Sequence, residues 1–291
     1  MKWTISCLCC FLLIGCNQKQ QSKANEDAIE PSIKIHQNTL KLIQSKGKSI
    51  IERIKVPGDF TRQKVELNSF ANYLRNLPLK PHGSKVKHYD GTKKPNNAIY
   101  EAVIDLPIGN KDLHQCADAI MRLKAEYLWE TGKYDDIHFN FTNGFRVEYS
   151  KWMEGNRMIV DGNKTYWKPG AQRTNNYDNF WKYMELIFTY AGTASLEKEL
   201  KPMDLSEMQI GDVFIKGGHP GHAVIVLDMA ENAKGEQLFM LGQSYMPAQE
   251  IQILKNNQTK HISPWYRLDN FEVLNTPEWS FTSDQLKRFE K

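Results

Sequence analysis

The segment from residue 210 to 228 limits the possible folds of this chain most strongly, because it has the pattern of two adjacent buried strands. Apolar residues fill positions 213–215 and, after a loop of Gly, His and Pro, return in an unbroken run over 223–227. Such runs, bounded by glycines, are typical of strands covered on both faces. His222 stands at the entrance of the second strand, directly after Gly221. A sheet would hold its ring while one nitrogen faces a cleft.

The rest of the chain predicts helices first and strands later. The expected helices cover residues 32–54, 69–77, 110–129 and 176–190, and the expected extended segments cover 86–89, 98–106, 139–149, 212–216, 222–228, 237–241 and 249–254. This order indicates an α+β protein in which an antiparallel sheet packs against helices.

The N-terminus has the composition of an export signal. Residues 1–15 combine Lys2 with a short apolar run, which is typical of a secretory signal peptide and too short to span a bilayer. The sequence Leu13-Ile14-Gly15-Cys16 resembles a bacterial lipobox and predicts lipidation of Cys16, although a plain signal peptide with a chance cysteine is the alternative. We therefore expect an extracytoplasmic protein, anchored through Cys16 to the outer membrane on a face that the sequence leaves open.

Composition then divides the remaining chain into three parts. Residues 16–31 are almost all polar and predict a flexible tether. Residues 32–54 are an N-terminal helical segment, and 55–291 form a single α+β domain, because no Gly/Pro/Ser-rich break divides them. The formal net charge of +4 comes from scattered basic residues, so nucleic acid is not an expected partner. No histidine and cysteine spacing matches a metal site, so no metal or other cofactor is expected.

Cys116 is the only cysteine that follows Cys16 in the sequence. A thiol without a partner in its own chain is a buried apolar residue, an intermolecular link or a nucleophile. Cys116 falls in the first turns of a predicted helix, where the helix dipole favours a thiolate. It also belongs to an apolar stripe, which predicts burial instead. The other members of this stripe are Leu113, Ala117, Ile120, Leu123, Tyr127 and Leu128. Both interpretations stay open.

The strand pair resembles the papain-like cell-wall peptidases of the NlpC type and the related CHAP amidases. In these families a Gly-Asp strand precedes a Gly-His strand, and a polar residue on the next strand orients the histidine. Gly211-Asp212 and Gly221-His222 match the first two elements, and Gln243 takes the third place. The resemblance implies a papain-like, NlpC-like fold in which Cys116 is the nucleophile, His222 the base and Gln243 the orienting residue. Cys116 lacks the Asp-Cys-Ser signature of those enzymes.

A wider part of the chain, over residues 55–285, is similar to a family of uncharacterised bacterial lipoproteins whose shared domain has no known function. The matching segments are Leu77-Pro78-Leu79, Cys116-Ala117-Asp118-Ala119, Tyr190-Ala191-Gly192-Thr193, Gly211-Asp212-Val213-Phe214-Ile215 and Gln243-Ser244-Tyr245-Met246-Pro247-Ala248-Gln249. This similarity implies membership and no activity.

Two functions follow from these observations. The first is a membrane-anchored cysteine hydrolase that cleaves an amide bond in cell-wall peptide. The second is a binding protein of the same fold that holds peptidoglycan or glycan fragments without turnover. Trp152, Arg157 and Tyr245 are the candidate substrate contacts, because flat aromatic rings with one polar group stack well on sugars and peptides. Aromatic side chains of this kind also serve as core or loop anchors.

Overall fold

The computed structural model describes residues 42–162 and 164–290. The predicted signal peptide, the tether, the lipidation site Cys16 and the first ten residues of the predicted helix 32–54 lie outside the described residues. Within them, no helix is long and apolar enough to cross a membrane.

A nine-stranded sheet forms the centre of the domain, and all its strand pairs are antiparallel. Its order is β2-β11-β10-β9-β8-β15-β7, with β1 paired to β9 and β12 paired to β10. The strands are β1 (Thr61–Arg62), β2 (Tyr100–Val103), β7 (Lys201–Pro202), β8 (Val213–Lys216), β9 (His222–Glu231), β10 (Gln237–Gln243), β11 (Gln252–Leu254), β12 (Trp265–Arg267) and β15 (Leu286–Arg288). The antiparallel α+β class is therefore confirmed.

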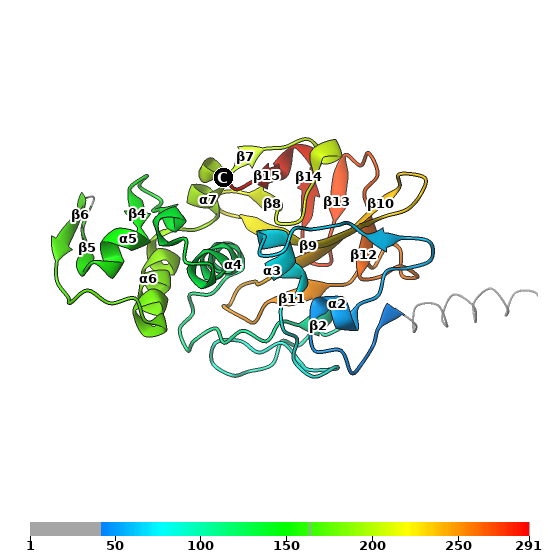
Figure 1. The fold of residues 1–291 in the computed structure, drawn as a ribbon, viewed down its shortest axis with the longest axis horizontal. Coiled ribbons are helices and arrows are strands. Elements are labelled where there is room, and N and C mark those ends of the chain that lie inside the picture. Colours follow the sequence, from blue (N-terminus) through cyan, green and yellow to red (C-terminus); the bar gives the residue numbers. More distant parts are fainter. Residues whose placement is uncertain (1–41, 163, 291) are drawn as a thin grey trace, which may run out of the picture.

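Six α-helices and three small two-stranded hairpins complete the described part of the chain (Figure 1). The α-helices are α2 (Ile50–Arg53), α3 (Phe70–Arg75), α4 (Cys116–Glu130), α5 (Tyr149–Met153), α6 (Tyr177–Tyr190) and α7 (Thr193–Glu199). The hairpins are β3–β4 (His138–Asn140 and Arg146–Glu148), β5–β6 (Asn156–Asp161 and Lys164–Pro169) and β13–β14 (Val273–Asn275 and Ser280–Thr282). In Figure 1, α4 stands between the sheet and a smaller lobe built from α5, α6 and the β5–β6 hairpin.

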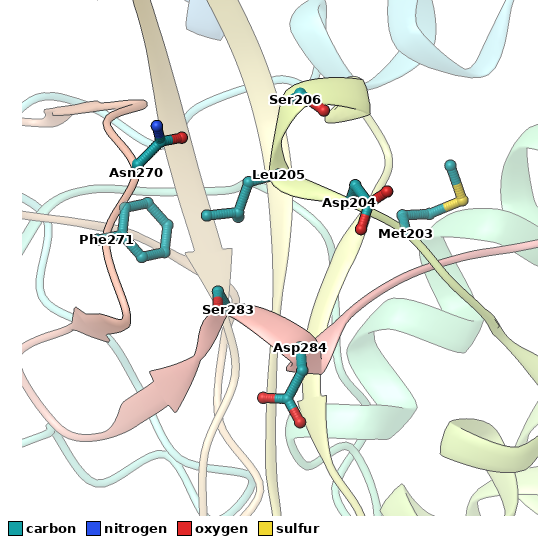
Figure 2. A pocket seen from close by; sticks show the side chains of 8 residues that line it. All are labelled: Met203, Asp204, Leu205, Ser206, Asn270, Phe271, Ser283 and Asp284. Carbon is teal, nitrogen blue, oxygen red and sulfur yellow. The ribbon is translucent and has the colours of Figure 1, made fainter.

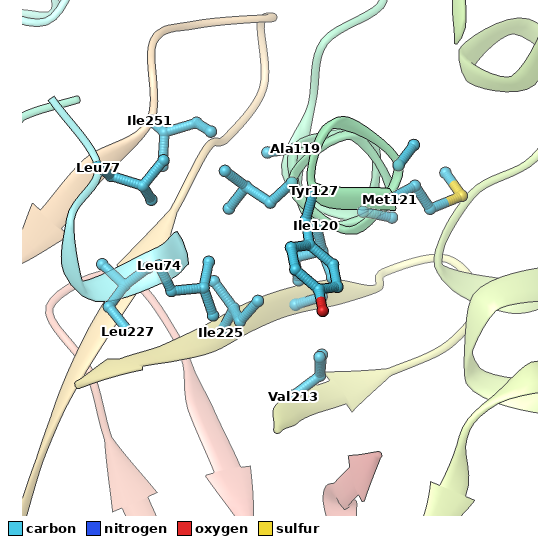
Figure 3. Close-up of a cluster of buried hydrophobic side chains, with 14 of the residues drawn as sticks. Leu74, Leu77, Ala119, Ile120, Met121, Tyr127, Val213, Ile225, Leu227 and Ile251 are labelled. Carbon is cyan, nitrogen blue, oxygen red and sulfur yellow. The ribbon is translucent and has the colours of Figure 1, made fainter. Parts of the chain in front are cut away.

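Side chains of β9 alternate between two hydrophobic cores, as the period of a strand requires. Ala223, Ile225 and Leu227 face the core that contains α3 and α4, which Figure 3 shows. Val224 and Val226 face a second core, which the β13–β14 hairpin covers. Each fully buried Val, Leu or Ile side chain stabilises the fold by roughly 1.5–3 kcal/mol. Because β9 contributes such side chains to both cores, it joins the two.

Helix α4 begins at Cys116 and is buried along most of its length. The backbone N–H of Gln115 donates to Asp118 Oδ2 at 3.0 Å, so the residue before the helix is bonded to its first turn. Residues from Cys116 to Leu128 pack against the sheet on one side and against α6 on the other. The expected helix over 110–129 is present, but its first six residues form the loop that leads into it.

A buried ion-pair cluster fastens the N-terminal part of the domain to β9. The carboxylate of Asp228, which is fully buried, accepts from Arg62 Nε at 2.6 Å and from Arg75 Nε at 2.7 Å. Arg62 lies on the edge strand β1, and Arg75 ends α3. The cluster therefore joins two elements to the central strand, and no local sequence pattern predicted it.

The prediction of a helix over 32–54 is wrong for residues 43–49. There the chain doubles back on itself, and only Ile50–Arg53 is helical. Gly47 lies so close to the returning chain that an added Cβ would stand 2.5 Å from the backbone nitrogen of Arg53. Its carbonyl accepts from Arg53 Nε at 2.8 Å. A tight loop, which only glycine permits here, replaces the predicted middle of the helix.

Candidate functional site

Cys116 is the first residue of α4, and its thiol is directed toward the beginning of β9. Its side chain is buried, with 7% of the residue exposed. The backbone N–H of Ala223, the residue after His222, lies close enough to favour the thiolate. The helix start therefore brings Cys116 to the strand end that carries His222.

His222 opens β9 and is held through one ring nitrogen. Its Nε2 lies 2.8 Å from the side-chain oxygen Oε1 of Gln243, at the end of the adjacent strand β10. The loop before His222 is tight at Gly221, where a Cβ would stand 2.4 Å from the carbonyl oxygen of Gly218, so this position requires glycine. The other nitrogen, Nδ1, has no hydrogen-bond partner among residues 42–162 and 164–290.

The contact with Gln243 continues into a chain of polar groups that the sequence did not predict. Gln243 Nε2 donates to Glu278 Oε2 at 2.6 Å, and Lys94 Nζ contacts the same oxygen at 2.7 Å. Lys94 is buried, and its ammonium also lies 5.3 Å from the ring centroid of Tyr245. The order of contacts is therefore His222, Gln243, Glu278 and Lys94, contributed by strands and loops that are far apart in the sequence.

Aromatic rings surround the imidazole. Tyr245, Trp279 and Phe281 have ring centroids 4.8, 5.5 and 5.9 Å from that of His222. Tyr245 also lies within electrostatic reach of the Cys116 thiol, so it touches one member of the candidate pair and neighbours the other. Tyr245 and Trp279 are partly exposed, and the neighbouring Met246 is exposed. These residues form the surface above the site.

His222 and Cys116 approach the strand end from different faces of the sheet. The imidazole stacks on Phe281 in the hairpin-side core, whereas α4 packs on the opposite face with Ala223. Within the described ranges no hydrogen bond joins the thiol to the imidazole. The two groups therefore lie near the same end of β9 but on opposite faces of the sheet.

Burial keeps both groups neutral. Burial and the neighbouring Asp118 carboxylate raise the pKa of the Cys116 thiol to about 11, although the Ala223 backbone N–H acts in the opposite direction. Burial also lowers the pKa of His222 to about 4; the hydrogen bond to Gln243 favours the charged ring, and the Lys94 ammonium opposes it. At neutral pH the site therefore holds a thiol and a neutral imidazole.

The family model DUF4846, described as a domain of unknown function, matches residues 50–288. The chain belongs to this family. No curated protein and no solved structure matches it. The DUF4846 match runs from α2 to β15, so Cys116, His222 and Gln243 all lie inside the domain.

Two of the candidate substrate contacts are elsewhere in the DUF4846 domain. Trp152 and Arg157 lie in the smaller lobe, on the far side of α4 from β9 (Figure 1). The guanidinium carbon of Arg157 stands 4.1 Å from the Trp152 ring centroid, and both side chains bond to Asn179. This pairing anchors α5 and β5 to α6. Of the three expected contacts, the structure brings only Tyr245 to His222.

A cavity of about 410 Å³ lies on the hairpin side of the DUF4846 sheet (Figure 2). Loops before β8 and β13 and the turn before β15 form its wall, and the lining residues are Met203, Asp204, Leu205, Ser206, Asn270, Phe271, Ser283 and Asp284. None of the candidate catalytic residues lines it. Among the described residues, no group of three or more His, Cys, Asp or Glu side chains is arranged to hold a metal ion.

Proposed function

We propose that this DUF4846 domain is a papain-like cysteine hydrolase that cleaves an amide bond. The observation that carries the proposal is the position of His222, whose Nε2 is held by Gln243 at 2.8 Å while Nδ1 has no partner in the described part of the chain. Helix α4 begins with Cys116, and this beginning lies beside the same strand entrance. A nucleophile, a base and an orienting group are the parts that such chemistry needs.

The reaction starts from the neutral pair. His222 Nδ1 takes the thiol proton while Cys116 Sγ attacks the amide carbonyl, and a tetrahedral intermediate forms. The imidazolium then gives that proton to the leaving amine, and a thioester to Cys116 remains. Water, deprotonated by the same nitrogen, hydrolyses the thioester and restores the thiol. The first backbone N–H groups of α4 lack helical partners and can stabilise the negative oxygen.

The proposed substrate is peptide of the bacterial cell wall. The lipobox-like sequence at Cys16 would anchor the protein to the outer membrane, and the polar tether would keep the domain within reach of peptidoglycan. The partly exposed rings of Tyr245 and Trp279 above His222 would contact the substrate.

A binding protein without turnover is the second candidate, and one observation favours it. The thiol pKa of about 11 and the imidazole pKa of about 4 describe a covered, neutral pair and not a preformed thiolate–imidazolium ion pair. In this case Tyr245 and Trp279 would hold cell-wall fragments, and Cys116 would be a buried residue.

Incubation with soluble peptidoglycan fragments separates the two functions. Wild type is expected to release new free amines, detected by mass spectrometry, and Cys116→Ala is expected to release none. Ser150→Ala is the control and should cleave like wild type. Ser150 lies in α5, in the smaller lobe, which α4 separates from β9. Retention of uncut fragments by both wild type and Cys116→Ala would support binding and would exclude the hydrolase.

A further inference from the structure

The side-chain amide of Gln243 lies between two different groups. It presents an oxygen to His222 Nε2 at 2.8 Å and an NH₂ group to Glu278 Oε2 at 2.6 Å. An amide can turn by 180° and exchange these two ends with little change of shape. Its orientation therefore depends on its second neighbour, and the second neighbour here is a carboxylate.

An ionised carboxylate accepts hydrogen bonds and donates none. If the amide of Gln243 turned over, its oxygen would face Glu278 Oε2, and two acceptors would meet in a mostly buried place. Lys94 strengthens this restriction, because its ammonium contacts the same Oε2 at 2.7 Å and forms an ion pair with the carboxylate. The side chain of Lys94 is 7% exposed and that of Glu278 is 21% exposed, so solvent screens this pair only weakly.

The fixed amide determines where the imidazole proton is. Since the oxygen of Gln243 faces Nε2, that nitrogen must carry the hydrogen, and the neutral ring has its lone pair on Nδ1. We propose that Glu278 and Lys94 are positioning residues that lock the Gln243 amide and thereby hold His222 in its Nε2–H tautomer. The inference deepens the proposed function, because Nδ1 is the nitrogen that would take the Cys116 proton, but its test needs no turnover.

The test is a nitrogen-15 NMR measurement of the His222 ring at neutral pH, in the full-length protein. Two-bond proton–nitrogen correlations show which ring nitrogen carries the hydrogen. The variant is Lys94→Met/Glu278→Leu, which replaces both charges, because removal of one would leave the other buried and unpaired. The control is Lys111→Met/Glu185→Leu. It removes a pair with the same 2.7 Å separation and a carboxylate of similar exposure, 23%, that has no contact with Gln243.

Wild type and the control are expected to show the Nε2–H tautomer alone. The Lys94/Glu278 variant is expected to lose this single form and to give signals of both tautomers, because its amide can turn over. A wild-type ring protonated on Nδ1 would overturn the proposal, and that result does not depend on any variant folding. A folded Lys94/Glu278 variant that keeps pure Nε2–H would overturn it too. If the tautomer responds as expected but Cys116→Ala still cleaves substrate, the lock stands and the hydrolase mechanism fails.

Discussion

At the scale of single residues, two neighbours in the first turn of α4 have pKa values shifted by burial. The pKa of the Cys116 thiol is raised to about 11, and that of the Asp118 carboxyl to about 8. The capping contact from the Gln115 N–H favours the ionised Asp118 but does not outweigh its burial. The start of α4 is therefore electrically neutral at low pH and gains negative charge as the pH rises.

The reactivity of Cys116 should follow this high pKa. Only the thiolate is alkylated, so the rate with iodoacetamide should rise about tenfold for each pH unit between 7 and 10. The measurement is the rate of mass increase of the native protein at a series of pH values. A rate that reaches a plateau below pH 8 would contradict a thiol pKa of about 11 and would indicate a preformed ion pair with His222.

Replacement of Asp118 by Asn should change how stability depends on pH. The pKa of Asp118 in the folded protein, about 8, is above its ordinary value of 3.8, so unfolding between these pH values releases a proton. The protonated Asp118 carboxyl therefore favours the folded protein at low pH, and this stabilisation is lost as the pH rises toward 8. From pH 5 to pH 8 the free energy of unfolding of wild type should fall by at most about 4 kcal/mol more than that of Asp118→Asn.

Urea denaturation at the two pH values measures this difference. Asp178→Asn is the control, because Asp178 is exposed in the first turn of α6. This control should follow the pH dependence of wild type. Parallel pH profiles for wild type and Asp118→Asn would show that the Asp118 carboxyl has an ordinary pKa in the folded protein.

At the scale of elements, β9 determines much of the architecture. It pairs with β8, β10 and β1, separates the two hydrophobic cores, and carries His222 near one end and Asp228 near the other. The pattern of buried strands predicted β8, β9 and β10 from local sequence alone, and the helical period predicted α4 and α6. These elements were predictable because each buries a regular set of apolar side chains.

The contacts that hold β9 in place had no local signal. Arg62 and Arg75 reach Asp228 over sequence separations of 166 and 153 residues, and Lys94 reaches Glu278 over 184. A charged residue in a sequence is most often a solvated one, so nothing distinguishes these side chains before the chain is folded. The resemblance to the NlpC-type peptidases led us to expect a contact between His222 and Gln243, but nothing in the sequence indicated Glu278 and Lys94 behind Gln243.

Removal of the Asp228 carboxylate should strongly destabilise the domain. Asp228→Ala leaves the guanidinium groups of Arg62 and Arg75 without their partner in a buried place, and such a loss typically costs about 3–5 kcal/mol. Urea denaturation gives the free energy of unfolding. Glu185→Ala, which removes the partner of the exposed Lys111, should cost at most about 1 kcal/mol. Equal losses in the two variants would show that the Asp228 cluster contributes no more than a surface pair.

At the scale of the whole molecule, the antiparallel α+β architecture was predictable, and the connection order of the sheet was not. The C-terminal strand β15 lies between β8 and β7, a pairing that joins distant parts of the chain and leaves no periodic pattern. The small lobe of α5, α6 and β5–β6 contains Trp152 and Arg157, so aromatic and charged composition alone did not distinguish a packing cluster from a substrate groove.

The whole molecule also limits how the proposed reaction can work. The candidate groups lie at the end of a strand, under partly exposed aromatic rings, and are neutral when no substrate is bound. Catalysis would then depend on proton transfer from Cys116 to His222 during attack. The proton would go to Nδ1, because the contact with Gln243 occupies Nε2 and leaves the Nδ1 lone pair available.

Detection of an acyl-enzyme tests the central proposal most directly. Wild-type protein is mixed with soluble peptidoglycan peptides, quenched in acid within seconds and digested, and the peptide that contains Cys116 is weighed by mass spectrometry. We predict a mass increase equal to the acyl part of the substrate on Cys116, less of it in His222→Ala, and none in Cys116→Ala. Release of products by wild type without any adduct, and at an equal rate by folded Cys116→Ala, would contradict the proposal.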